Sequence, residues 1–157
     1  MGTEIERKFL VTGLSWRALA EPVVMRQGYL CANRDRSVRV RIAGAHAWLT
    51  IKGGRELSAD GLVRSEFEYA IPSEEARELL ALCEGTVIEK RRYRIPLGDL
   101  VWEVDEFEGA NQGLVVAEVE LEAGGPPFKK PEWIGREVTD DPRYLNANLV
   151  ECPFSDW

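Results

Sequence analysis

Short runs in which apolar and polar residues alternate account for most of the chain. Side chains alternate between the two faces of a β-strand, so such runs predict strands with one apolar face. Eight runs fit this pattern: TEIERKFLV (3–11), VVMRQGYLC (23–31), SVRVRIA (37–43), AWLTIKG (47–53), LVRSEFEYAI (62–71), TVIEKRRYRIP (86–96), LVWEVDEFE (100–108) and LVVAEVELE (114–122). Turn-like pieces such as AGAHA, GGRELSADG, PLGD and EGANQG join several of them. The pattern predicts a mainly β (α+β) fold with antiparallel strands.

Helical signals interrupt the strands at three places. EEARELLALC (74–83) carries an apolar stripe of leucines, and Ser73 precedes it as the expected N-cap. A shorter helix is expected near LSWRALA (14–20). Near the end of the chain, Asp141 and Pro142 stand where a capping residue and a first helical residue are expected. We therefore expect a few helices flanking the strands.

The strand faces opposite the apolar ones carry charged residues two positions apart. These positions are Glu4, Glu6 and Lys8; Arg39 and Arg41; Lys52; Glu66 and Glu68; Lys90, Arg92 and Arg94; Glu103 and Asp105; and Glu118, Glu120 and Glu122. Acids fall on the first, fifth, seventh and eighth strands, whereas bases fall on the third, fourth and sixth. Like charges at neighbouring positions on one face repel each other. This sorting by sign indicates a face that meets a ligand.

Two architectures accommodate such strands. One is a sheet whose charged face is open to solvent and whose apolar face is covered by helices. The other is an antiparallel barrel of about eight strands with a charged lumen, and a barrel of that size can hold one small ligand. We favour the barrel, because solvated strand faces usually mix Thr, Ser, Lys, Glu and Gln without sorting them by sign.

The two kinds of charge suit the two parts of one ligand. Carboxylates without His or Cys are hard oxygen ligands for Mg²⁺ or Mn²⁺. Clustered Lys and Arg side chains suit phosphate oxygens. A polyphosphate–metal complex presents both charges at once. The chemistry this implies is metal-assisted phosphoryl transfer to water or to an internal hydroxyl.

Composition narrows the class of protein. The 157 residues predict a single domain over 1–157. The formal net charge of −7 argues against nucleic acid or an anionic membrane as a partner. Cys31, Cys83 and Cys152 have no metal-binding spacing, and no apolar run has the length of a signal peptide core or a membrane span. A reduced, cytoplasmic protein is expected.

The order of the charged motifs resembles the CYTH superfamily, also called the triphosphate tunnel metalloenzymes. The matching motifs are Glu4-x-Glu6-x-Lys8, Arg39-x-Arg41, Lys52, Glu66-x-Glu68, Lys90-x-Arg92 and Glu118-x-Glu120, and the likeness extends to REVTDDPRYLNANL at 136–149. The resemblance implies an eight-stranded antiparallel tunnel that binds a triphosphate and a divalent metal. The compact chain looks most like the bacterial inorganic tripolyphosphatases of that superfamily.

Carried over by position, the resemblance implies roles for the matching residues. The phosphates would be held by Lys8, Arg39, Arg41, Lys52, Lys90 and Arg92. The metal would be held by Glu4, Glu6, Glu118 and Glu120, with Glu66, Glu68 and Asp105 as further ligands or water-orienting groups. Catalysis is expected from Glu4, Glu6 and Lys8 on the first strand.

The expected function is metal-dependent hydrolysis of inorganic tripolyphosphate, with Mg²⁺ or Mn²⁺ as cofactor and a small-molecule triphosphate as partner. Members of the superfamily also hydrolyse thiamine or nucleoside triphosphates, or cyclise ATP, so these activities remain alternatives. A non-catalytic polyphosphate-binding module is the alternative outside the enzymes. The retained carboxylates favour an enzyme, because a pure anion binder would gain by losing them. A monomer and a homodimer both fit the sequence.

Overall fold

The computed structural model describes residues 4–33, 35–58, 61–122 and 125–157, apart from the side chains of Glu4 and of residues 54–64. Its strands, within that part of the chain, are β1 (Glu4–Val11), β2 (Val23–Ala32), β3 (Arg36–Ala43), β4 (His46–Ser58), β5 (Gly61–Ile71), β6 (Glu84–Leu97), β7 (Leu100–Phe107), β8 (Val115–Glu122) and β9 (Ile134–Glu137). The helices are η1 (Ser15–Leu19), α1 (Ser73–Ala81), η2 (Gly109–Asn111), η3 (Pro142–Tyr144), α2 (Asn146–Glu151) and η4 (Phe154–Asp156), of which only α1 and α2 are α-helices. The mainly β prediction is confirmed.

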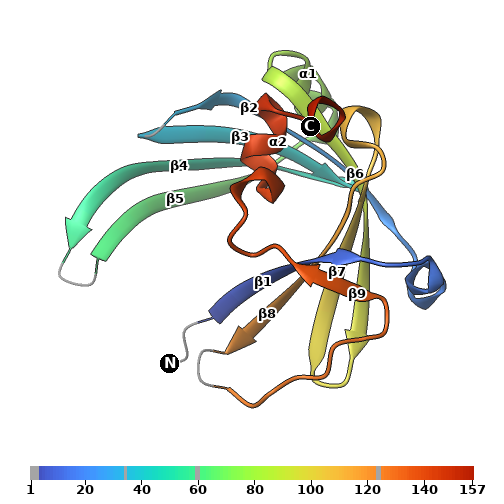
Figure 1. Ribbon diagram of the computed structural model, residues 1–157. Coiled ribbons are helices and arrows are strands. Elements are labelled where there is room, and N and C mark those ends of the chain that lie inside the picture. Colours follow the sequence, from blue (N-terminus) through green and yellow to red (C-terminus); the bar gives the residue numbers. More distant parts are fainter. Residues whose placement is uncertain (1–3, 34, 59–60, 123–124) are drawn as a thin grey trace.

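All the described strands belong to one antiparallel sheet in the order β5-β4-β3-β2-β6-β7-β8-β1-β9. Figure 1 shows the sheet curling, so that the part from β2 to β5 lies across from the part formed by β1, β8 and β9. Within the described residues, β5 and β9 are the two edges and do not pair with each other. The fold is therefore tunnel-like, as expected, but the sheet is open and holds one strand more than the eight predicted.

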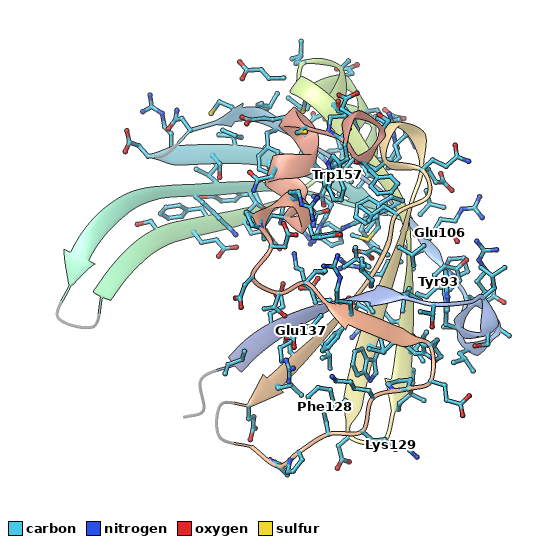
Figure 2. The ribbon with its side chains drawn as sticks, in the orientation of Figure 1. Tyr93, Glu106, Phe128, Lys129, Glu137 and Trp157 are labelled. Atoms are coloured by element: carbon cyan, nitrogen blue, oxygen red, sulfur yellow. The ribbon has the colours of Figure 1, made fainter. Side chains whose placement is uncertain are left out.

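The outer face of the curled sheet carries most of the apolar core. Phe9, Tyr93, Trp102 and Val119 lie on this face and pack with Trp16 of η1 and other buried residues. Figure 2 shows Tyr93 and Glu106 directed towards the side of η1. A second outer cluster lies beneath α1. Burial of these side chains supplies the main favourable contribution to folding.

The inner face becomes apolar at one end, where α2 covers it. Ile88, Phe107 and Val116 have the strand parity of the charged positions, and they pack against Leu149 and other residues of the C-terminal segment. Figure 1 shows α2 between the two halves of the sheet. The charged part of the inner face is therefore bounded by this helix at one end.

Several local expectations need correction. Ser73 does not cap α1: Pro72 is the N-cap, and the Ser73 hydroxyl donates to the Ala45 carbonyl at 3.0 Å. Asp141 does accept a hydrogen bond from the Arg143 N–H, but the helix that it begins is a short 3-10 turn, and α2 starts only at Asn146. The stretch predicted as a turn at 53–61 is largely strand. No helix in the described ranges is long and apolar enough to cross a membrane.

Candidate functional site

Cross-strand register places the charged positions on one continuous face. Residues directly opposite each other in an antiparallel pair point to the same side of the sheet. The opposed pairs run Lys8–Glu118, Glu118–Glu103, Glu103–Arg94, Asp105–Arg92, Lys90–Met25, Gln27–Arg41, Arg39–Thr50, Thr50–Glu68 and Lys52–Glu66. Every predicted site residue whose side chain is described therefore lies on the inner face. The side chain of Glu4 lies outside the described residues.

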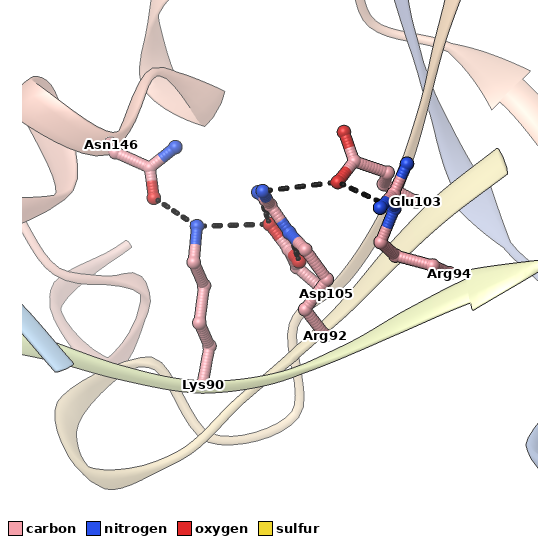
Figure 3. Close-up of polar contacts among 6 residues, drawn as sticks. All are labelled: Lys90, Arg92, Arg94, Glu103, Asp105 and Asn146. Atoms are coloured by element: carbon pink, nitrogen blue, oxygen red, sulfur yellow. Dashed lines mark hydrogen bonds and ion pairs between the residues drawn. The ribbon is translucent and has the colours of Figure 1, made fainter. Parts of the chain in front are cut away.

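A buried ion-pair cluster occupies the middle of this face. Lys90 Nζ lies 2.9 Å from Asp105 Oδ2, and Arg92 Nε and Nη2 donate to the two oxygens of Asp105 at 2.8 and 2.9 Å (Figure 3). Arg92 Nη1 also lies 3.2 Å from Glu103 Oε2, while Arg94 Nε is 3.9 Å from the same oxygen. Two positive and two negative side chains thus neutralise one another, with Arg94 at the margin.

Burial and charge oppose each other inside the cluster. Burial alone would raise the pKa of Asp105, but Lys90 and Arg92 outweigh it and hold that pKa below its ordinary value. Burial lowers the pKa of Lys90, against the attraction of Asp105. The pKa of Arg92 is raised, because its hydrogen bond and charge contact with Asp105 exceed the effect of burial. The Asp105 carboxylate is the group on which both cations depend.

The C-terminal helix reaches this cluster through Asn146. Its Oδ1 accepts a hydrogen bond from Lys90 Nζ at 3.1 Å (Figure 3). Lys90 is only 2% exposed, and its ammonium also lies 5.6 Å from the centroid of the Phe107 ring. The sequence pattern did not single out Asn146, because one polar residue in a short helix has no periodic signal. Its position on the inner face follows only from the packing of α2.

Arg39 and Arg41 differ from the cluster in the hydrogen bonding of their Nε atoms. The Nε atoms of both are buried without a hydrogen bond. Burial lowers the pKa of Arg41, and the charges of Arg39 and Arg92 lower it further, against the weaker attraction of Glu68 and Glu103. The Arg41 guanidinium lies 5.3 Å from the centroid of the Trp48 ring. Two neighbouring guanidinium groups that repel each other, each with a buried Nε–H that lacks an acceptor, suit an anion with several oxygens.

A carboxyl pair lies on the β1–β8 side of the face. Burial, a hydrogen bond with the Glu6 carboxyl and the Glu6 charge raise the pKa of Glu118 to about 8, against the opposing charges of Lys8 and Arg92. Lys8 is buried directly opposite Glu118, and its backbone N–H donates to Thr139 Oγ1 at 3.0 Å. Glu120 follows on the same face and is exposed. A carboxyl group with a raised pKa, such as that of Glu118, can exchange its proton for a metal cation.

The remaining predicted residues lie towards the β5 edge. Lys52 is half-buried opposite the exposed Glu66, and Glu68 accepts a hydrogen bond from the Thr50 hydroxyl at 3.2 Å. At the opposite end of the face from α2, a hollow of about 280 Å³ is lined by Arg94, Glu103, Glu118, Glu120 and Glu122 among others. Acidic groups therefore gather around that hollow, while the unpaired arginines lie on β3.

The donor set fits a divalent metal that is shared with substrate. No group of three or more His, Cys, Asp or Glu side chains gathers at ligating distance within the described ranges. Mg²⁺ commonly uses one or two carboxylates together with water and substrate phosphate oxygens. The Glu6–Glu118 pair matches that pattern. Its carboxylates would hold such an ion once deprotonated.

Three comparisons with known proteins agree on the type of protein to which this chain is similar. The CYTH domain family model matches residues 2–150. An inorganic triphosphatase from Acetivibrio thermocellus is 52% identical over 158 residues, covering 100% of this chain and 99% of that protein. An inorganic triphosphatase from Nitrosomonas europaea is 40% identical over 153 residues, covering 94% and 97%. The crystal structure of the inorganic triphosphatase NE1496 aligns with a TM-score of 0.76 at 36% identity, covering 96% and 95% of the two chains.

Proposed function

The chain belongs to the CYTH domain family, and from this premise we propose that it is a metal-dependent hydrolase of inorganic tripolyphosphate. Two full-length relatives carry the name inorganic triphosphatase, which supports this substrate class. The observation that carries the proposal most directly is the unpaired Arg39–Arg41 pair on the same face as the Glu6–Glu118 carboxyls. One face thus offers Nε donors without an acceptor for phosphate and neighbouring carboxyl groups for metal.

The cations of the inner face divide the work of holding the phosphate chain. Arg39 and Arg41 have free Nε donors, and Lys8 lies across from the carboxyl pair. We assign the phosphate contacts to Lys8, Arg39, Arg41, Lys52, Lys90 and Arg92. Phosphoryl transfer depends mainly on such positioning and on neutralisation of the charge spread over the phosphate oxygens. The opening of the curled sheet is the side from which a small linear anion enters.

The carboxylates of β1 and β8 are assigned to the metal and to water. Glu4, Glu6, Glu118 and Glu120 are the proposed ligands, with Glu66 and Glu68 as further ligands or water-orienting groups. A bound Mg²⁺ or Mn²⁺ neutralises phosphate charge and polarises the bond to be cleaved. Glu4 and Glu6 would orient the attacking water and accept its proton, while the bond from the attacked phosphorus to the bridging oxygen breaks. Lys8 would stabilise the charge that develops on the phosphate oxygens.

The whole chain, 1–157, is proposed to form one such tunnel domain. Cys31, Cys83 and Cys152 are all free thiols. We infer a reducing, cytoplasmic location from this cysteine usage.

The test is phosphate release from tripolyphosphate, ATP, thiamine triphosphate and pyrophosphate, each with Mg²⁺, Mn²⁺ or EDTA. We expect rapid release from tripolyphosphate with either metal, far slower release from ATP, and none with EDTA. Equal rates on ATP would overturn the substrate assignment, and analysis of that reaction for cyclic AMP would reveal a cyclase. Undiminished release in EDTA would overturn the metal role. Binding of tripolyphosphate without turnover would indicate a binding module instead.

A further inference from the structure

Asp105 is a buried carboxylate of the inner face whose two oxygens both contact protein nitrogens. Its side chain is 7% exposed, and both of its oxygens accept hydrogen bonds or ion pairs from protein nitrogens. Three contacts of 2.8 to 2.9 Å, two from Arg92 and one from Lys90, take three of its roughly four lone-pair positions. This carboxylate therefore has only about one lone-pair position left for a metal ion.

The two cations that Asp105 contacts are fixed at defined places. Arg92 meets it through a bidentate fork, which sets the plane of the guanidinium. Lys90 is held from two sides, by Asp105 and by Asn146 of α2 (Figure 3). Each cation retains N–H groups beyond these contacts, since an ammonium has three and a guanidinium five. We assign these remaining N–H groups to phosphate oxygens.

Electrostatics supports the same assignment. Lys90 and Arg92 repel each other across the buried cluster, and Asp105 is the strongest opposing charge for Lys90. Without that carboxylate, two cations of one sign would remain buried side by side, and each would turn towards another acceptor such as Glu103 or Asn146. Asp105 thus sets where the positive charge of β6 lies.

We propose that Asp105 acts as a positioning residue, which orients Lys90 and Arg92 towards the phosphate chain, rather than as a metal ligand. The inference rests on the proposed function, because it assigns those two cations to the triphosphate. It also revises the role implied for Asp105 by the family resemblance.

The experiment measures two affinities separately. Tripolyphosphate binding is followed by calorimetry in EDTA, where no turnover is expected, and Mn²⁺ binding is followed by electron paramagnetic resonance without tripolyphosphate. For Asp105→Asn we expect about tenfold weaker tripolyphosphate binding, as for a lost charged hydrogen bond, with Mn²⁺ affinity within about twofold of the parent. Glu118→Gln is the matched control, in which Mn²⁺ affinity falls and tripolyphosphate affinity does not.

Each other outcome overturns the proposal. A loss of Mn²⁺ affinity in folded Asp105→Asn would make Asp105 a metal ligand. Unchanged or tighter tripolyphosphate binding by Asp105→Asn would show that the Asp105 charge only repels the anion. If the unsubstituted protein bound no tripolyphosphate, the proposed function itself would fail, which is a distinct result.

Two further variants keep the test decisive. Lys90→Gln/Asp105→Asn removes one charge of each sign from the buried cluster, so we expect it to fold even if Asp105→Asn does not. If Asp105 is a positioning residue, the Mn²⁺ affinity of this double variant should be unchanged. If Asp105 is a metal ligand, that affinity should be lost. In an Arg92→Gln background, Asp105→Asn should weaken tripolyphosphate binding by less than about threefold. If Asp105 acts through Arg92, the effect of its substitution on binding is largely lost once Arg92 is gone. A full tenfold further loss would contradict action through Arg92.

Discussion

The inner face holds two sets of basic residues in opposite states. On β6, Lys90 and Arg92 are paired with Asp105 and contact Asn146 and Glu103. On β3, the Nε atoms of Arg39 and Arg41 have no acceptor among the described residues. Contacts with the protein fix the first set, here called the framework set, before it meets a phosphate through its remaining N–H groups. The second set, here called the ligand set, has Nε donors that no described residue accepts.

The neighbouring strands explain the difference. β6 lies beside β7, so Arg92 is opposite Asp105 and Arg94 is opposite Glu103. β3 lies between β2 and β4, whose residues opposite Arg39 and Arg41 are Tyr29, Gln27, Thr50 and Trp48. None of those four carries a charge at neutral pH. Strand order therefore decides which cations lie directly opposite a carboxylate on the neighbouring strand.

The largest expected effect comes from breaking the framework set. Arg92→Gln leaves Asp105 buried with Lys90 as its remaining partner, so we expect the free energy of unfolding to fall by about 3 kcal/mol. Urea unfolding measures this change. A variant as stable as the parent would show that the cluster contributes no stability and would remove the contrast with β3.

The ligand set should respond in the opposite way. Arg41→Gln removes a half-buried cation for which burial and the repulsion of Arg39 and Arg92 outweigh the attraction of Glu68 and Glu103, so stability should be unchanged or higher. Loss of a charged contact to phosphate should lower kcat/KM for tripolyphosphate by about 100-fold. Steady-state kinetics and urea unfolding on the same sample check both parts. A strong loss of stability with normal kcat/KM would assign Arg41 to the framework instead.

The carboxyl pair predicts a dependence on pH. Because the pKa of Glu118 is raised to about 8 in the metal-free protein, Mn²⁺ must displace a proton below that pH. Mn²⁺ affinity should therefore rise by about tenfold per pH unit between pH 6 and 8 and then level off. Titrations of Mn²⁺ at several pH values measure the slope, and Glu118→Gln should flatten it.

The stability of the metal-free protein should fall with rising pH, whereas Mn²⁺ affinity should rise. The pKa of Glu118 is higher in the folded state than its ordinary value of 4.5, so the folded protein binds more protons between those two values. The free energy contributed by the protonated group is present below about pH 4.5 and is lost as the pH rises through about 8. Urea unfolding in EDTA should show this fall, and Glu118→Gln should lack it. A parent protein whose pH dependence equals that of the variant would contradict the raised pKa.

The smallest effect is expected at Arg94. This side chain is 69% exposed, and its Nε lies 3.9 Å from Glu103 Oε2. Surface pairs of this kind contribute little. Arg94→Gln should change kcat/KM for tripolyphosphate by less than about threefold and leave unfolding unchanged. A tenfold loss of kcat/KM would place Arg94 with the ligand set.

The faces of the strands could be predicted from the sequence, but the pairs across them could not. The two-residue alternation in SVRVRIA and VIEKRRYRI assigns each charge to one side of its strand, and the register confirms a shared face. The PLGD turn joins the runs that form β6 and β7, but the alternation does not give the register between them or the pairing of β2 with β6, which depends on long-range contacts. The pairing of Asp105 with Arg92 could therefore not be predicted from the alternation alone.

The elements of the fold also divide into those that local alternation predicts and those that depend on tertiary packing. Long alternating runs identified β1 to β8, whereas β9 spans only Ile134–Glu137 and is too short to show alternation. Asn146 reaches Lys90 only because α2 packs on the apolar end of the inner face. Local pattern thus determines elements and faces, while tertiary packing determines which polar groups meet.

A crystal structure with tripolyphosphate and Mn²⁺ bound, with the metal located by its anomalous signal, tests the account most directly. We expect phosphate oxygens within hydrogen-bonding distance of the Arg39 and Arg41 guanidinium groups, and an anomalous peak beside the Glu6 and Glu118 carboxylates. The Lys90–Asp105–Arg92 contacts should remain intact. An anomalous peak at Asp105, or a phosphate chain that contacts neither Arg39 nor Arg41, would contradict the division between framework and ligand cations.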